Sequence, residues 1–301
     1  MPEQALTVSE LVKRYDQVTA VDHLSFSIER GELFGLLGPN GAGKTSTIRA
    51  LMGIVPPDEG TVRLLGGAPK QARGRVGYLP EERGLYAKQR LLEVLVFLAQ
   101  LKGLDADTAH ENAMRWLERV DLQDRAQDKI SELSRGMQQK AQLVATLVHD
   151  PDLIILDEPF QGLDPVNVNL VKEILRELQS RGKTIALSSH QMNLVEELCD
   201  RIVLINHGRA VLYGPLSEIK RKYAERTVRL RTGAGTEALQ ATLGGDNVEH
   251  RNGVDIVHLA DWEPSDLLRR LLDAGIEVLS YEVATAPLQD IFVAAVQAEA
   301  A

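Results

Sequence analysis

The most informative motif of this chain is Gly38-Pro39-Asn40-Gly41-Ala42-Gly43-Lys44-Thr45. It fits the pattern G-x-x-x-x-G-K-[ST], in which glycines let the backbone curl so that several N–H groups converge on one anion at a helix N-terminus. Residues 32–37 before it are mostly apolar and predict a buried strand, and residues 46–52 after it predict a helix. This context favours a phosphate-binding loop over an ordinary glycine-rich turn, so a nucleotide site is expected here.

Two side chains at the end of this stretch add chemistry to the loop. Lys44 is expected to place a point charge on the β- and γ-phosphates of a nucleotide. The hydroxyl of Thr45 is expected to be a ligand for Mg²⁺.

The composition is that of an ordinary globular protein. The chain has 301 residues, of which 44% are hydrophobic and 26% charged, and its net charge of −9 is a poor match for a nucleic-acid backbone. The single cysteine, Cys199, excludes an internal disulfide and suits a reducing cytosol. The N-terminus lacks a secretory pattern, and no apolar run approaches the ~20 residues of a membrane helix. A membrane process would therefore need another chain to span the membrane.

Polar side chains follow two further apolar strands. Residues 153–156 are apolar and lead directly into Asp157 and Glu158, and residues 184–189 lead into His190. In open α/β sheets ligands collect at the carboxyl ends of parallel strands, so these side chains are expected near the phosphate loop. Asp157 would hold Mg²⁺, and Glu158 would orient or deprotonate an attacking water. The alternative is that the acidic residues only end a strand and cap a helix, but the upstream loop favours the functional interpretation.

Other segments of the first 222 residues are expected to form layers around that sheet. Residues 5–30 alternate apolar and polar positions and predict an antiparallel hairpin layer, in which Tyr15 would either pack across strands or stack on a base. Residues 88–149 show helical spacing. Within them Ser134 is placed as the N-cap of a helix, a position that is usually structural but can also present N–H groups to an anion.

The pattern restarts after residue 222. Strands are expected at 227–231, 254–259 and 276–283, and helices at 237–243, 265–274 and 288–297. The suggested order βαββαβα is that of a small ferredoxin-like α+β domain. The predicted domains are therefore 1–222, with a helical subdomain at about 88–149, and 223–301, in which no catalytic constellation is visible.

Taken together, these motifs resemble the ATP-binding cassette (ABC) ATPases, the motor subunits of ABC transporters. The resemblance covers about residues 5–220 and keeps the family order: the phosphate loop as Walker A, residues 153–158 as Walker B with the catalytic glutamate, residues 133–137 (LSRGM) as the signature, residues 162–164 as the D-loop and His190 as the switch histidine. It implies an α/β fold of the P-loop NTPase class, with a RecA-like core, an antiparallel β-subdomain and an α-helical subdomain, plus the small α+β C-terminal domain.

The resemblance also implies roles for individual residues. Catalysis would rest on Glu158, His190 and Lys44, and Mg²⁺ would be held by Thr45, Asp157 and Glu81. ATP would be bound by Tyr15, stacked on adenine, and by Gly38, Pro39, Asn40, Gly41, Ala42, Gly43, Lys44, Thr45, Ser46, Glu81, Ser134, Gly136 and Asp164. The signature residues Ser134 and Gly136 would act on ATP held by a second cassette.

Two positions depart from the family pattern. Glu81 stands where the family usually has glutamine, and Met137 replaces the glutamine of the commoner LSGGQ signature. Residues 133–140 (LSRGMQQK), residues 78–86 (YLPEERGLY) and the C-terminal extension are similar to one branch, the sodium-efflux (Nat-type) and ABC-2 exporters. This branch implies separately encoded integral-membrane permeases and a location at the cytoplasmic face of the cell membrane. The acidic charge balance argues against a nucleic-acid partner. Two alternatives remain: a soluble ABC ATPase without a transport role, and a nucleotide-sensing regulatory module.

Overall fold

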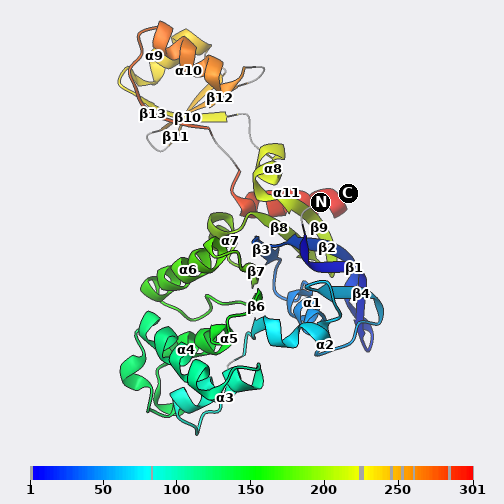
Figure 1. Cartoon of the computed structure of the whole chain (residues 1–301). Coiled ribbons are helices and arrows are strands. Elements are labelled where there is room, and N and C mark those ends of the chain that lie inside the picture. Colours follow the sequence, from blue (N-terminus) through cyan, green and yellow to red (C-terminus); the bar gives the residue numbers. More distant parts are fainter. Residues whose placement is uncertain are drawn as a thin grey trace. The chain divides into compact units, whose positions relative to one another are not determined.

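The computed structural model describes residues 3–82, 84–223, 227–244, 247–251, 254–259, 262–283 and 286–300. These residues divide into two compact units (Figure 1). The larger unit contains the described residues up to Leu216 and those from Ala295 onward, and the smaller contains Ser217–Ala294. The predicted domain boundary between residues 222 and 223 stays a prediction.

The elements alternate between strands and helices along most of the chain. The strands are β1 Gln4–Tyr15, β2 Val18–Glu29, β3 Leu33–Leu37, β4 Glu59–Leu64, β5 Val76–Leu79, β6 Leu153–Asp157, β7 Thr184–Ser189, β8 Arg201–Asn206, β9 Arg209–Pro215, β10 Thr227–Thr232, β11 Val248–Arg251, β12 Val254–His258 and β13 Val278–Val283. The α-helices are α1 Lys44–Leu51, α2 Pro69–Ala72, α3 Leu91–Leu101, α4 Ala106–Arg119, α5 Arg135–Leu147, α6 Pro165–Ser180, α7 Met192–Leu198, α8 Leu216–Lys222, α9 Gly235–Leu243, α10 Pro264–Asp273 and α11 Leu288–Ala300.

A six-stranded sheet of order β5-β6-β7-β3-β8-β9 forms the centre of the larger unit. Its strands are parallel except for β9, which pairs antiparallel with β8. Strands β3, β6 and β7 are buried at every position, as expected for apolar runs that helices cover on both faces. The predicted α/β class and the parallel core are therefore confirmed.

A second, antiparallel sheet of order β2-β1-β4 packs beside α1 and contains the predicted N-terminal hairpin. One apolar cluster joins it to the central sheet, with the rings of Phe26 and Phe34 stacked 5.5 Å apart. Helices α3, α4 and α5 form a separate lobe of the same unit (Figure 1). In this lobe α5 begins where the sequence predicts, because the Ser134 hydroxyl accepts a hydrogen bond from the Met137 N–H.

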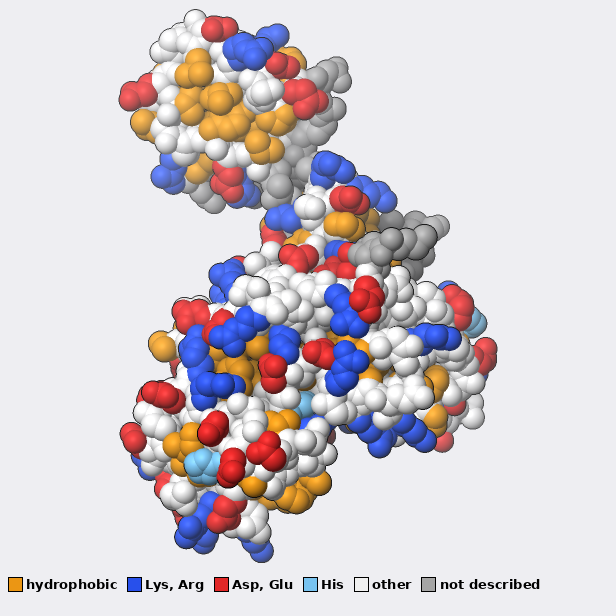
Figure 2. Space-filling model, viewed as in Figure 1, with side chains coloured by type: hydrophobic (Ala, Val, Ile, Leu, Met, Phe, Trp, Pro, Cys, Tyr) orange, Lys and Arg blue, Asp and Glu red, His pale blue; other side chains and the backbone are white. Residues whose placement is uncertain are grey.

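The smaller unit has the order βαββαβ from β10 to β13, with α11 following in sequence. Its four strands are antiparallel in the order β11-β12-β10-β13, which is the predicted ferredoxin-like arrangement. Strand β11 is an element for which the sequence suggested no residue range. Hydrophobic side chains gather on the face carrying α9 and α10 (Figure 2), where Leu272 is 60% exposed.

None of the helices within the described ranges is both long enough and apolar enough to cross a lipid bilayer.

Candidate functional site

Three adjacent strands of the central sheet deliver the predicted site residues to one edge. The phosphate loop follows β3, Glu158 follows β6 and His190 follows β7. Because β7 pairs with both β6 and β3 in parallel register, the carboxyl ends of all three strands meet. The structure therefore brings together side chains that are more than a hundred residues apart in sequence.

A cavity of about 280 Å³ lies at this edge. It is lined by Ala20, Asn40, Gly41, Gly43, Lys44, Thr45, Ser46, Glu81 and Glu158. The lining combines backbone N–H groups at the N-terminus of α1 with one ammonium group, which is the donor set of an anion site. We call this the nucleotide cavity.

Three residues of the loop do not line this cavity but stabilise the loop itself: Gly38, Pro39 and Ala42. The Lys44 ammonium donates to the carbonyl oxygens of Gly38 and Pro39, at 2.8 and 3.2 Å, so the loop holds its own lysine. The Ala42 N–H donates to the Pro39 carbonyl, which closes the turn.

Glu158 lies between two nitrogen-bearing side chains. One carboxylate oxygen, Oε1, is 3.0 Å from His190 Nδ1 and 3.8 Å from Lys44 Nζ. Its side chain is only 7% exposed, and its backbone adopts φ 50°, in the left-handed region that few non-glycine residues occupy. The rare backbone angle turns the carboxylate from the end of β6 toward the cavity, and such strain is a feature of functional sites.

Asp157 lies one residue earlier and is completely buried. Its Oδ1 accepts a hydrogen bond from the Ser188 hydroxyl, and that hydroxyl in turn accepts one from the Glu158 N–H. Oδ2 is buried and has no hydrogen-bond partner among the residues that the structure describes. A buried carboxylate oxygen without a partner is costly unless a cation or water satisfies it. Asp157 and the Thr45 hydroxyl therefore fit Mg²⁺, which needs only one or two protein ligands when nucleotide phosphates supply the rest.

Besides Gly38, Pro39 and Ala42, four further predicted nucleotide ligands do not line the cavity of their own chain. Tyr15 ends β1 and is 39% exposed, with the Lys13 ammonium 5.4 Å from its ring centre. Ser134 and Gly136 begin α5, and Asp164 is the N-cap of α6. These roles remain predictions.

The N-termini of α5 and α6 lie next to each other. A Cβ added to Gly136 would lie 4.0 Å from Asn167 Nδ2, and Asn167 donates to Asp164 through both its backbone and its side chain. These hydrogen bonds, with that of the Asn167 N–H foremost, lower the pKa of Asp164. The predicted signature and D-loop residues thus form one exposed surface, apart from the nucleotide cavity.

Comparison with known proteins identifies the family. Residues 21–161 match the model of the ABC transporter family, and residues 214–296 match the C-terminal domain of DrrA1-3-like ATP-binding proteins. The chain is 39% identical, over 96% of its length and 97% of the relative's, to YhaQ of Bacillus subtilis, an uncharacterised ABC transporter ATP-binding protein. This chain belongs to the ABC transporter ATP-binding family.

Further relatives agree with this assignment. The Nod factor export ATP-binding protein I of Paraburkholderia xenovorans is 43% identical, with 73% of each chain covered. The solved structure of an ATP-binding subunit of an ABC transporter has a TM-score of 0.69 and 32% identity, covering 73% of this chain and 93% of that one. The predicted family, the P-loop NTPase fold and the ATPase activity that defines the family are therefore confirmed.

The loop that carries Glu81 is held by the helix that begins at Ser134. The side chain amide of Gln142, two turns into α5, donates to the carbonyls of Pro80 and Glu82, at 3.2 and 3.0 Å. Tyr78 precedes this loop, and burial, with a contribution from the charge of Asp157, raises its pKa to about 12. These two hydrogen bonds tie α5 to the backbone on both sides of Glu81.

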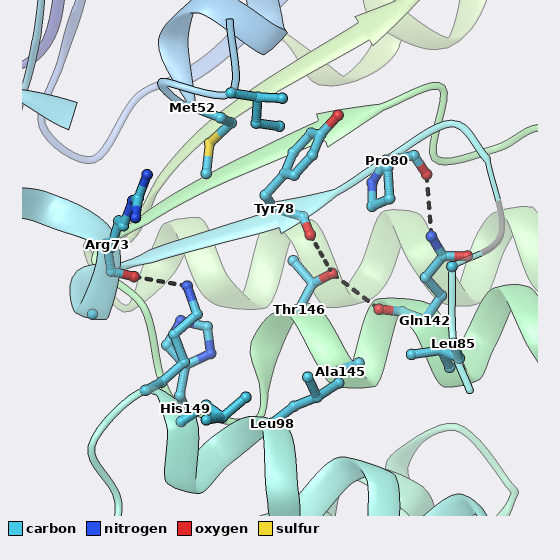
Figure 3. Close-up of a pocket in the computed structure, with 15 residues that line it drawn as sticks. Met52, Arg73, Tyr78, Pro80, Leu85, Leu98, Gln142, Ala145, Thr146 and His149 are labelled. Atoms are coloured by element: carbon cyan, nitrogen blue, oxygen red, sulfur yellow. Dashed lines mark hydrogen bonds between the residues drawn. The ribbon is translucent and has the colours of Figure 1, made fainter. Parts of the chain in front are cut away.

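A second and larger cavity of about 530 Å³ lies on the other side of this loop, between the end of α1, β5, α3 and α5 (Figure 3). We call it the α3–α5 cavity. Its apolar lining includes Met52, Ile54, Leu85, Leu98, Leu101 and Ala145. Arg73 and His149 lie at one end, and Pro80 and Leu85 lie at the other (Figure 3).

Sequence reasoning missed three residues that shape the site: Ala20, Gln142 and Ser188. Ser188 had a usable signal, because it lies near the end of a predicted apolar strand, two residues before His190. Ala20 and Gln142 had no such signal. A small residue in a hairpin and an amide in an amphipathic helix are common in those elements and do not indicate a site.

Proposed function

We propose that this chain is the ATP-hydrolysing motor of an exporter, and that two cassettes close around ATP to drive separately encoded permease subunits at the cytoplasmic face of the cell membrane. The observation that supports a motor is the position of Glu158, which lies between Lys44 and His190 beside the phosphate loop. Export is supported by the Nod factor export relative.

In this proposal the nucleotide cavity orients the phosphates and the attacking water. The N–H groups of the loop, with Lys44, neutralise the charge of the phosphates. Glu158 accepts a hydrogen bond from the water and polarises it, while His190 Nδ1 holds the carboxylate in position. Asp157, Thr45 and Glu81 would hold Mg²⁺, which supplies positive charge against the β- and γ-phosphates.

The second cassette completes the site. Ser134, Gly136 and Asp164 lie on one exposed surface and do not line the nucleotide cavity of their own chain. The N-terminus of α5, with its free N–H groups, suits a γ-phosphate bound to another copy. Tyr15, exposed at the end of β1, is proposed to stack on adenine.

The connection to a membrane partner is proposed to run through the loop at Pro80 and Glu81. These consecutive residues line different cavities, Pro80 the α3–α5 cavity and Glu81 the nucleotide cavity. A partner segment that fills the α3–α5 cavity would therefore press on the backbone beside Glu81, and Gln142 would carry the same movement to α5.

Substitution of Glu158 with glutamine tests the motor. Glu158→Gln keeps the size of the side chain but removes its capacity as a base, so turnover should fall by about 10²-fold or more. ATP binding should persist, and the loaded protein should accumulate as a dimer in analytical ultracentrifugation. Glu196→Gln, a conservative change away from the nucleotide cavity, is the control and should turn over ATP at the native rate.

Brisk hydrolysis by Glu158→Gln would remove Glu158 from this role. The permease partnership is tested separately: the neighbouring genes are searched for a multi-helix membrane protein, which is then co-expressed with this chain. A motor should co-purify with that protein and hydrolyse ATP at a rate that the transported compound changes. A nucleotide sensor or a soluble ATPase would show neither property.

A further inference from the structure

The end of β1 that carries Tyr15 is tied by one carboxylate to the loop between α1 and β4. Asp58 lies in this loop, and its Oδ2 accepts a hydrogen bond from the Arg14 N–H at 2.6 Å. Its Oδ1 accepts another from the Lys13 ammonium at 3.0 Å. The Asp58 N–H in turn donates to the Val12 carbonyl. One residue of the loop therefore holds the three consecutive positions of β1 that precede Tyr15.

The Lys13 ammonium lies between this loop and the Tyr15 ring. It donates to the Pro56 carbonyl at 3.1 Å as well as to Asp58, and it is 5.4 Å from the centre of the ring. Lys13 is only 8% exposed, which is unusual for a lysine and requires partners for its charge. A cation at this distance is attracted to the face of an aromatic ring and restrains it. Because Tyr15 is still 39% exposed, part of its ring remains open to another molecule.

The loop that holds Lys13 continues directly from the helix of the phosphate loop. Helix α1 begins at Lys44, and the N–H groups of Ile54 and Val55 donate to the Arg49 carbonyl near its end. Asp58 follows three residues after this bonded turn. A short segment with its own hydrogen bonds therefore joins the phosphate-binding end of α1 to the contacts around Tyr15.

The neighbouring carboxylate forms an ion pair of a different kind. Glu59 Oε1 lies 2.8 Å from Arg14 Nη2, with the two side chains 53% and 48% exposed, and such exposed pairs contribute little. Asp58 instead pairs with a nearly buried cation that contacts a ring. The hydrogen bond from the Arg14 N–H, and after it that from Lys13, lowers the pKa of Asp58, so this carboxylate is charged at physiological pH.

We propose that Lys13 and Asp58 are positioning residues for the base of the bound nucleotide, because their ion pair orients the Tyr15 ring before the nucleotide arrives. The inference rests on the proposed function, in which Tyr15 stacks on adenine. A ring that is already held loses less conformational freedom on binding, so more of the stacking appears as affinity. Neither Lys13 nor Asp58 lines the nucleotide cavity, and their effect is therefore on the base and not on the phosphates.

Binding of Mg-ADP and of Mg-pyrophosphate to the full chain separates the base from the phosphates. Only ADP carries a base, and neither probe has a γ-phosphate to hydrolyse. Asp58→Asn keeps an oxygen for the Arg14 N–H but removes the charge that holds Lys13, whereas Lys13→Met removes the cation. Each variant should bind ADP about fivefold more weakly in isothermal titration calorimetry and bind pyrophosphate with native affinity. Glu59→Gln, the matched change of the neighbouring carboxylate, should leave both affinities unchanged.

Turnover and a second background distinguish positioning from a merely structural role. Asp58→Asn should raise the KM for ATP about fivefold and leave kcat unchanged, since only binding is affected. In a Tyr15→Ala background neither Asp58→Asn nor Lys13→Met should weaken ADP binding further, because no ring is left to orient. The inference is overturned by equal losses for ADP and pyrophosphate, by a loss that persists without the ring, or by native ADP affinity in both variants.

The outcome is separate from that of the proposed function. Tyr15→Ala alone tests the stacking and should weaken ADP about tenfold with no effect on pyrophosphate. If it does so while the Lys13 and Asp58 variants bind normally, the stacking stands and the inference fails. If Tyr15→Ala binds ADP with native affinity, the proposed base site fails and the inference fails with it. The motor itself is tested by Glu158→Gln, whose loss of turnover does not involve these residues.

Discussion

At the scale of single residues, His149 shows how burial changes the chemistry of a side chain. It is 7% exposed, and its Nε2 bonds to the Val76 carbonyl at 3.2 Å. Its Nδ1 is buried and has no partner within the described part of the chain. Burial lowers its pKa to about 4, and the nearby Lys102 charge acts in the same direction. The imidazole is therefore neutral in the folded protein throughout the physiological range.

This lowered pKa predicts a pH-dependent stability. The unfolded chain has the ordinary histidine pKa of about 6.5, so it takes up a proton before the folded protein does. Above about pH 6.5 His149 therefore does not lower the free energy of unfolding. As the pH falls from there toward 4, the unfolded chain takes up a proton that the folded protein does not, and the free energy of unfolding falls. When the pH is lowered from 7 to 5, the titration of His149 should lower the free energy of unfolding by on the order of 2 kcal/mol.

Urea unfolding of His149→Gln measures the effect. The variant cannot titrate, so its unfolding free energy should fall less than that of the native protein over this pH interval. His110→Gln removes an exposed histidine on α4 and should leave the pH profile unchanged. If the free energy of unfolding fell equally in the native protein and in His149→Gln, His149 would not be the source of the pH dependence.

At the scale of elements, two glycines of the phosphate loop differ in the space around them: Gly43 lies against strand β2, and Gly41 has open space beside it. Gly43 has φ 106°, and a Cβ there would lie 2.3 Å from the Ala20 carbonyl oxygen of β2. Gly41 has φ 79°, and a Cβ there would meet nothing within 4 Å. Both positions carry the backbone cost of a positive φ, but only Gly43 also has a backbone atom in the way.

Alanine substitutions at these two glycines are therefore a matched pair. Gly41→Ala should lower stability by about 1 kcal/mol, the cost of the positive φ alone. Gly43→Ala should lose at least about 2 kcal/mol more, because β2 or the loop has to move, and its ATP affinity should fall at least about tenfold. Thermal unfolding and nucleotide titration check both outcomes. Similar losses in the two variants would mean that the contact with Ala20 is unimportant.

At the scale of the whole molecule, the site is divided between two surfaces of the same chain. Lys44 lines the nucleotide cavity, whereas Gly136 lies on the separate surface at the start of α5. If two copies face each other head to tail, each nucleotide contacts Lys44 of one copy and Gly136 of the other. If one chain sufficed, the two residues would act within one copy.

Mixing two inactive variants separates these possibilities. Lys44→Ala and Gly136→Asp should each be inactive alone, and Gly136 has room for a larger side chain, since a Cβ added there would have its nearest neighbour at 4.0 Å. In a mixture half of the dimers combine the two variants and contain one intact site. The mixed sample should recover about a quarter of native ATPase activity, as random pairing of two chains in a dimer requires. No recovery would argue against the shared site.

Much of the fold could be predicted because its signals are local. The apolar strands β3, β6 and β7 stand out as runs, and Ser134 and Asp164 cap their helices as short-range hydrogen bonding requires. Strand β11 was not assigned because four residues beside a turn carry too little periodicity. The motif residues could be named in advance, since glycine, lysine and carboxylates at fixed spacings perform one chemistry.

The family, the nucleotide chemistry and the order of the elements follow from residue types within a few positions of one another, so the amino-acid sequence is enough to predict them. Which groups share a space follows from packing alone: Glu158 between Lys44 and His190, Gln142 on the Glu81 loop, and Arg73 with Lys102 at an apolar cavity. These contacts depend on the sheet order and on helix packing, which bring distant segments within a few ångströms. No local pattern encodes that proximity.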